Sequence, residues 1–267
     1  MRNKVLFLFG LLLLAVSSSY SKSNNYLIKS NIKLNDSENL HHTVKLNLSS
    51  LPFSTISMQY EYLLGNKMSA ALGIRYTPSS KIPFLNKIID FTDLNEEMDA
   101  QDEINIKEIL ESSRLSGFAI TPEFRFYLGK TGKGFYLAPF LRYEQNNFHA
   151  KTEYTTSYND IGLASTAINF NSYGAGIMIG SQFKISRNVY LDWWILGPYF
   201  RNTQIKIDLE GKNIPEEDKT SFEESIEDFE LGGFKPSIER QGDHIIAKGS
   251  INFWAIRGFG LNLAFRF

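Results

Sequence analysis

The chain has 267 residues, a formal net charge of −1 and no cysteine, and aromatic residues make up 14% of it. The lack of cysteine excludes a disulfide framework, thiol chemistry and a lipid-anchored cysteine, and the balanced charge gives no reason to expect a nucleic-acid partner. The 21 Phe and 13 Tyr suit the aromatic girdles of a membrane barrel, although a β-sandwich could share this bias.

Residues 1–21 are predicted to be a signal peptide. Arg2 and Lys4 are basic, an apolar run extends from Val5 to Val16, and small serines follow as cleavage sites. The apolar run is short for a membrane helix, and no later stretch reaches the roughly 18 apolar residues that such a helix needs. Residues 22–42 follow as a polar leader, so we expect an exported protein whose main domain covers 43–267.

From residue 43 onward, apolar and polar residues alternate in short segments with the period of two that is typical of strands. The expected strands are centred on 44–48, 56–62, 68–76, 118–126, 135–144, 173–183, 189–199 and 259–267. A bulge is expected near Asn171, where the alternation slips phase.

The clearest pattern lies between Gly117 and Glu144, in the hairpin sequence GFAITPEFRFYLGKTGKGFYLAPFLRYE. In its first strand Phe118 and Phe126 fall on one face, whereas Glu123 and Arg125 fall on the other. A soluble hairpin would turn the apolar face to a core, and a membrane barrel turns it to lipid and the charges to the lumen.

The connections favour the barrel. Those after even-numbered strands are short (65–66, 129–134 and 185–188), whereas three of the four after odd-numbered strands are long (51–55, 77–113, 146–166 and 203–248). Outer-membrane barrels have short periplasmic turns and longer extracellular loops. An eight-stranded barrel is just wide enough for side chains to fill its interior, so no aqueous pore is expected.

Two of the long links, 77–113 and 203–248, are acidic and partly helical in pattern. Residues 81–114 carry nine acidic and four basic residues, and residues 203–243 carry twelve and five. Asp93 with Glu96 fits a capping box, and Pro215 fits a first helical turn. Solvated helical faces explain the charge better than a Ca²⁺ site, because neither link has the ligand spacing of an EF-hand. An extracellular partner is the functional alternative.

The hairpin sequence, the run VKLNLSSLPFSTISMQYEYLLGNKMSAALGIRY and the aromatic end of the chain resemble the small outer-membrane β-barrel proteins of uncharacterised function common in Bacteroidota. The resemblance implies an outer-membrane address and contact with lipid and lipopolysaccharide. It also implies that Phe267 belongs to a signal read by the outer-membrane assembly machinery. It implies no catalytic residues and no cofactor.

Charged residues on the polar faces of the strands are interpreted as a structural network in the lumen, because mixed charges in a narrow barrel should pair and plug it. The expected members are Glu61, Arg75, Glu123, Arg125, Arg142, Glu144 and Asp192, and Lys45 and Arg266 share their phase. A conduction path is the less favoured interpretation.

An enzyme is the second hypothesis, since some small barrels modify lipid A with a His and a Ser or carboxylate near the rim. The four histidines are His41, His42, His149 and His244, and Ser157 or Ser165 could approach His149. No nucleophile-elbow sequence or metal-ligand spacing supports such a site, so no catalytic, metal or cofactor residue is assigned.

The sequence therefore predicts an all-β fold, namely an eight-stranded antiparallel up-and-down transmembrane β-barrel with long, partly helical extracellular loops. The expected role is structural or interactive: adhesion, envelope integrity or ligand display.

Overall fold

The computed structural model describes residues 40–83, 111–156, 158, 160–212, 214–227 and 234–267. The predicted signal peptide, nearly all of the leader and the centre of the first acidic link lie outside the described residues. The elements are β1 (His42–Asn47), η1 (Leu51–Phe53), β2 (Ile56–Leu63), β3 (Met68–Lys81), β4 (Arg114–Tyr127), β5 (Gly134–Thr155), β6 (Ile161–Lys184), β7 (Val189–Lys212), α5 (Glu216–Glu227), β8 (Ser237–Gln241) and β9 (His244–Arg266).

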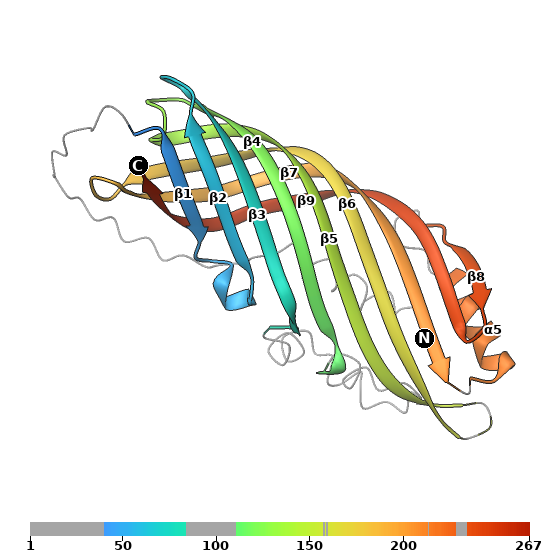
Figure 1. Ribbon diagram of the computed structural model, residues 1–267. Helices are drawn as coiled ribbons and strands as arrows, with labels where there is room; N and C mark the ends of the chain where they lie inside the picture. Colours follow the sequence, from blue (N-terminus) through green and yellow to red (C-terminus); the bar gives the residue numbers. More distant parts are fainter. Residues whose placement is uncertain (1–39, 84–110, 157, 159, 213, 228–233) are drawn as a thin grey trace, which may run out of the picture.

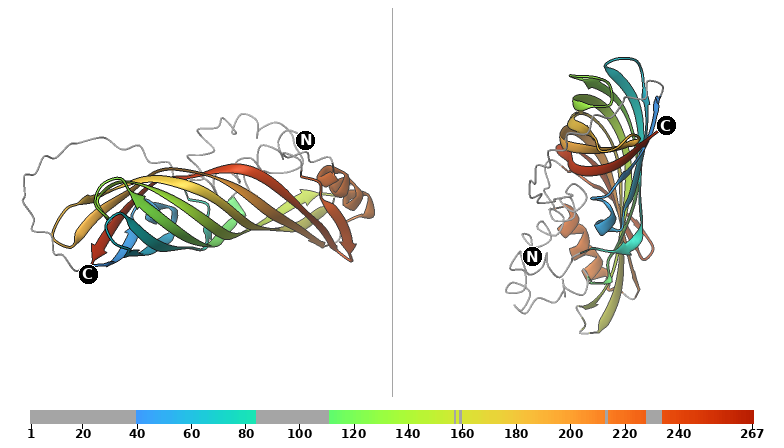
Figure 2. Two further views of the ribbon diagram at one scale, coloured as in Figure 1. Left: turned by 90° about the horizontal axis from the view of Figure 1, so that it is seen from above. Right: turned by 90° about the vertical axis from the view of Figure 1, so that its left-hand side faces the viewer.

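The fold is all-β, as predicted, and its single antiparallel sheet closes in a ring (Figures 1 and 2). The strand order is β1-β2-β3-β4-β5-β6-β7-β9-β8, and β1 also pairs with β9. The sheet has nine strands where the sequence predicted eight. The additional strand, β8, pairs with β9 and does not take part in closing the ring.

Four strands are much longer than the alternation predicted. β5, β6, β7 and β9 have 22, 24, 24 and 23 residues, whereas β1 and β2 have 6 and 8. Their far ends, together with α5 and β8, project beyond the ring at the lower right of Figure 1. We call this part the extension. The predicted links 146–166 and 203–248 are therefore corrected: most of each is regular strand or helix.

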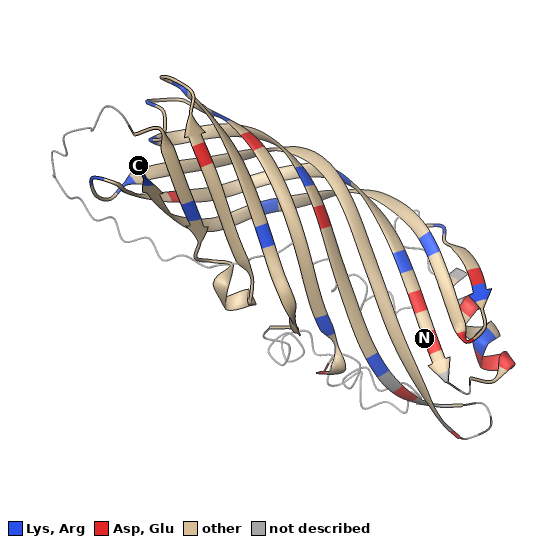
Figure 3. Ribbon diagram, viewed as in Figure 1, with Lys and Arg blue, Asp and Glu red and all other residues tan. Residues whose placement is uncertain are grey.

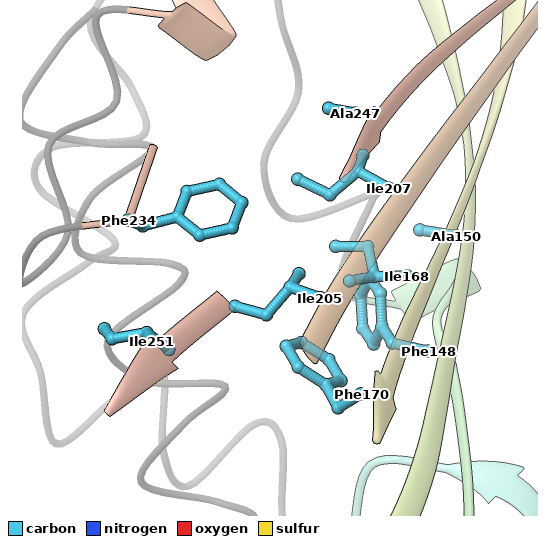
Figure 4. Close-up of a cluster of buried hydrophobic side chains, with 9 residues drawn as sticks. All are labelled: Phe148, Ala150, Ile168, Phe170, Ile205, Ile207, Phe234, Ala247 and Ile251. Carbon is cyan, nitrogen blue, oxygen red and sulfur yellow. The ribbon is translucent and has the colours of Figure 1, made fainter. Parts of the chain in front are cut away.

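The extension has its own apolar core on the inner side of the sheet. Its largest cluster is shown in Figure 4 and consists of Phe148, Ala150, Ile168, Phe170, Ile205, Ile207, Phe234, Ala247 and Ile251. Phe222 and Ile226 of α5 pack on a second cluster that includes Leu209 and Ile245. The helix therefore covers apolar surface that would otherwise face water. Among the described residues, no helix is long and apolar enough to cross a bilayer.

The ring closes along a short ladder, which we call the seam. β1 pairs with β9 over five residues, from Asn262 to Arg266, whereas β7 pairs with β9 over nearly the whole length of both strands. β8 pairs with β9 from His244 to Lys248. Within the described part of the chain, the stretch of β9 from Gly249 to Gly260 has β7 as its one strand partner.

Candidate functional site in the interior of the ring

The outer surface of the ring is apolar. Along β5 the outward residues from Phe135 to Tyr143 are Phe, Leu, Pro, Leu and Tyr, and Leu141 is 61% exposed. The same pattern holds on other strands of the ring, where Ile177 of β6 and Trp254 of β9 are exposed. We call this surface the apolar belt. Its presence means that the ring exposes to its surroundings the side chains that a soluble sheet would bury.

Aromatic residues mark both edges of the belt. The edge near the extension carries Tyr76, Phe118, Tyr143, Tyr173, Phe200 and Trp254. The edge near the short turns carries Tyr60, Tyr62, Phe126, Phe135, Phe183, Phe265 and Phe267. Cross-strand partners link several of the first set, since Tyr143 pairs with Tyr173 and Phe200 with Trp254.

The inside and outside of the sheet exchange character at the edge near the extension. On β5, on the side of this edge toward the short turns, Tyr143 points out and Glu144 points in. On the side toward the extension, Gln145 and His149 point out while Phe148 is buried inside. The backbone alternation continues without a break across this edge. A single strand therefore has an apolar exterior over one half and a polar exterior over the other.

Two groups of charged side chains occupy the interior of the ring, and together they contain all seven residues of the predicted lumen network. We call the group nearer the short turns the lower network. It consists of Lys45, Glu61, Glu123, Arg125, Asp192 and Arg257. The second group, the arginine cluster, consists of Arg75, Arg142 and Arg201 around Glu144.

The lower network is dense and electrically balanced, with three cations and three carboxylates. Lys45 Nζ lies 2.6 Å from Glu61 Oε2 and 2.5 Å from Asp192 Oδ2, and the side chains of all three residues are 0% exposed. Arg125 Nη1 lies 2.8 Å from the same Asp192 oxygen, and Arg257 Nη1 lies 2.5 Å from Glu123 Oε1. Such short, multiple contacts offset the large desolvation penalty of buried ions.

Aromatic hydroxyls and rings complete the lower network. Tyr136 donates a hydrogen bond of 2.7 Å to Asp192 Oδ1, and Tyr127 donates one of 2.6 Å to Glu61 Oε1. The guanidinium carbon of Arg125 lies 4.4 Å from the centre of the Tyr136 ring. These packed side chains fill the cross-section of the ring near its short turns.

The arginine cluster is looser and unbalanced. Arg142 Nε donates a hydrogen bond of 2.7 Å to Glu144, but the nearest approaches of Arg75 and Arg201 to that carboxylate are 3.4 and 3.5 Å. Among the described residues, three guanidinium groups therefore share one carboxylate, which leaves a charge of +2. Each arginine is adjacent in sequence to an aromatic residue of the upper belt edge, so the cluster lies level with that edge.

The sequence did not assign Arg201 and Arg257 to the interior. On β7 the inward residues are even-numbered up to Trp194 and odd-numbered from Gly197, because the ladder to β6 shifts register at Ile179/Gly180 and leaves Ile195 as an extra residue. On β9 the phase changes at Phe259, which has a φ of 57°. The bulge predicted near Asn171 is wrong, since pairing is regular there.

The histidines lie outside this interior. His42 Nδ1 is 2.5 Å from the Tyr60 hydroxyl, and His244 Nδ1 is 2.8 Å from Asp208. His149 is exposed on the outward face of the extension. In the β5–β6 ladder, the residue that pairs with Ser165 lies two positions along β5 from His149. Ser157 lies outside the described residues. The described part of the chain holds no group of three or more potential metal ligands.

The acidic residues of the second link are partly paired within the chain. Arg240 of β8 contacts Glu216 at 3.0 Å and also Glu223, both on α5. Lys219 donates a hydrogen bond to Glu216, and this bond, followed by the lysine charge, lowers the pKa of the glutamate. Figure 3 shows this dense group of charges at α5 and β8.

Phe267 lies at the seam and faces outward. Its backbone N–H donates to the carbonyl of His42 at 2.8 Å, and it accepts from the His42 N–H at 3.1 Å. Its ring stacks on that of His42 with centroids 5.7 Å apart. The residue therefore adds a further pair to the β1–β9 ladder.

These features define a class of protein: a closed antiparallel sheet with an apolar exterior and a charged, packed interior. The chain belongs to the family described as proteins of unknown function DUF3575, whose model matches residues 11–222. No curated protein and no solved structure matches the chain.

Proposed function

We propose that the protein is an integral outer-membrane β-barrel protein that displays the extension at the cell surface. Eight strands cross the bilayer in this proposal, and the role is structural or interactive rather than catalytic. Outer-membrane lipid surrounds the belt, and the assembly machinery of that membrane inserts the barrel.

The observation that carries the proposal is the exchange of inside and outside character along the long strands. On β5 the apolar belt runs from Phe135 to Tyr143, a length that matches the 9–11 residues that a tilted strand needs to cross a bilayer. Aromatic residues at both edges match the girdles of transmembrane barrels. A soluble fold would have no reason to reverse its polarity at Tyr143 while the strand continues unchanged.

The packed lower network supports a role other than conduction. Lys45 forms ion pairs with both Glu61 and Asp192, and all three side chains are fully buried inside the ring, so an open aqueous path would require this group to separate. Breaking a buried ion pair is strongly unfavourable. The extension, with its covered apolar core and charged α5–β8 surface, is the part available to an extracellular partner.

The location is tested by cell fractionation and by gel migration with and without heating. We expect the mature protein in the outer-membrane fraction, with an unheated form that migrates differently from the heated form. Recovery as a soluble periplasmic protein would overturn the proposal.

A site-specific fluorophore tests the orientation of the belt. We expect a label at Leu141 to be quenched by a lipid-embedded quencher, and a label at Arg142, one residue along, to be protected from it. Labels at Gln145 and Asn146 serve as matched controls above the belt, where neither should be quenched. Quenching at 142 without quenching at 141 would mean that the proposed orientation is reversed.

A further inference from the structure

We propose that the arginine cluster is a binding site for a phosphate group. The site lies inside the ring, at the level of the upper aromatic edge of the belt. This inference goes beyond the proposed function, because neither a structural role nor surface display requires a ligand there.

The first argument is charge. Arg75, Arg142 and Arg201 come from β3, β5 and β7 and converge on Glu144, which leaves a charge of +2 on the cluster. The lower network, nearer the short turns, is balanced, so the excess distinguishes the arginine cluster from the lower network. A dianionic phosphate would neutralise the excess.

The second argument is the supply of unused donors. Each guanidinium has five N–H groups in a rigid fork that fits phosphate oxygens. Arg201 donates to Thr203 and Tyr199 at 3.1 and 3.3 Å, and Arg75 donates to Asn146 at 3.4 Å. These contacts are longer than the 2.7–2.9 Å of a strong charge-assisted bond. In addition, Arg75 Nε is buried and has no acceptor among the described residues.

The third argument is access to the cluster. Arg142, Glu144, Ser172, Tyr199 and Arg201 lie against one another and leave no room for a water molecule between them. Arg75 is the most exposed member of the cluster, with 24% of its side chain accessible. An entering phosphate group would therefore part the arginine side chains and replace the contacts of 3.4 and 3.5 Å that Arg75 and Arg201 make with Glu144.

Phosphate binding by this cluster would be opposed by Glu144. The carboxylate competes with the ligand for the same guanidinium groups, so Glu144→Gln should tighten phosphate binding. The amide keeps the shape of the side chain and can still accept a hydrogen bond. A carboxylate with a purely structural role would give no such gain.

The test uses the full mature chain in maltoside micelles, which contain no phosphate, with inorganic phosphate titrated at constant ionic strength. We expect saturable binding by calorimetry and a rise in the thermal unfolding midpoint. Arg201→Gln should weaken binding by roughly tenfold or more, the change expected from losing one charge-assisted hydrogen bond. Arg201→Lys, which keeps the charge, is the second variant in case the glutamine variant fails to fold.

The matched control is Arg266→Gln. Arg266 is also a buried interior arginine, but it lies near the short turns, where it donates to Thr43 and Gly132 at 3.2 Å. Its variant should bind phosphate as the natural protein does. Absence of saturable binding by the natural protein, equal losses in the Arg201 and Arg266 variants, or weaker binding by Glu144→Gln would each overturn the proposal.

The source of the phosphate is distinguished by doping the micelles with dioleoyl phosphatidic acid or, as control, dioleoylglycerol. Retention of the acid in native mass spectra, dependent on Arg201, identifies a lipid headgroup as the ligand. Binding of inorganic phosphate without retention of the acid identifies a soluble phosphate. Because all measurements are made in detergent, a failure of the outer-membrane assignment would leave their outcome unaffected.

Discussion

Asp192 is bonded to two cations at once in the interior of the ring. Its carboxylate accepts from Lys45 and Arg125 at 2.5 and 2.8 Å, and all three side chains are fully buried. We expect Asp192→Asn to lower the free energy of unfolding by about 3–5 kcal/mol, because it leaves buried positive charge without its partner. Urea unfolding followed by gel migration measures this loss.

Asp208→Asn is the control for that substitution, on the same strand. Asp208 contacts Lys206 at 3.5 Å and His244 at 2.8 Å in the partly exposed extension, and exposed pairs contribute about 0–1 kcal/mol. Equal losses in the two variants would show that the burial of the lower network does not determine its contribution to stability.

His244 gives the extension a dependence on pH. The hydrogen bond with Asp208, followed by the charge of that carboxylate, raises the pKa of the imidazole. The pair therefore stabilises the fold fully at pH values below the unfolded pKa of about 6.5, and this stabilisation is lost as pH rises through the higher folded pKa. NMR titration of the ring protons should show a lower midpoint in Asp208→Asn. An unchanged midpoint would contradict the assignment.

At the scale of the element, β5 contains both kinds of exterior and so provides an internal comparison. We expect Leu141→Arg to lower the free energy of unfolding in lipid vesicles by about 2–4 kcal/mol, as charges on the lipid face of a barrel do near the midplane. Gln145→Arg, two outward positions above, should have little effect, because that side chain already meets water in the proposed orientation. Similar losses at both positions would place the boundary elsewhere.

Much of the ring could be predicted because one physical rule, alternation across a strand, holds along most of its strands. Phe118, Glu123 and Arg125 of β4 take the faces that their spacing indicates. In the extension the same alternation continues, with Ile205, Ile207 and Leu209 buried and Lys206 and Asp208 between them. The sequence pattern places these residues in the acidic link 203–248. The core that receives those isoleucines includes Phe148, Phe170 and Phe234, which are distant in sequence.

The arginine cluster could be predicted only in part. Arg75, Arg142 and Glu144 follow from strand phase, but Arg201 does not, because the extra residue Ile195 changes the phase of β7 before it. A bulge depends on how two strands match across a ladder and not on the local pattern of one strand. Arg257 precedes the predicted strand 259–267, and the phase of that strand does not carry over to it, because β9 changes phase at Phe259.

At the scale of the whole molecule, the chain combines a packed ring with a separate covered core. The lower network and its aromatic partners fill the ring near the short turns, and the cluster around Phe148 and Phe234 lies in the extension. The arginine cluster is located between these two parts. It is therefore the place where an interior ligand could meet both the ring and the extension.

Phe267 is expected to matter more for this architecture than its exposed position suggests. Removing it or its ring takes away contacts with His42 at the seam. We expect deletion of Phe267, and to a lesser degree Phe267→Ala, to reduce the yield of heat-modifiable protein in the outer membrane. The control is Phe135→Ala, which removes an exposed aromatic from the same edge of the belt but away from the seam. Equal yields would argue against a special role for this residue.

The short seam also has a consequence for the order of folding. Apart from β7 and β9, the other neighbouring strands in the ring follow one another directly in the chain. The β1–β9 ladder instead pairs Val44 with Phe265, across nearly the entire chain. Contacts so distant in sequence form late, because the loop-closure entropy must be overcome before they contribute. The last intermediate is then an open sheet with two unpaired edges. Such edges readily pair with another chain, so this intermediate would be the species most in need of protection before closure.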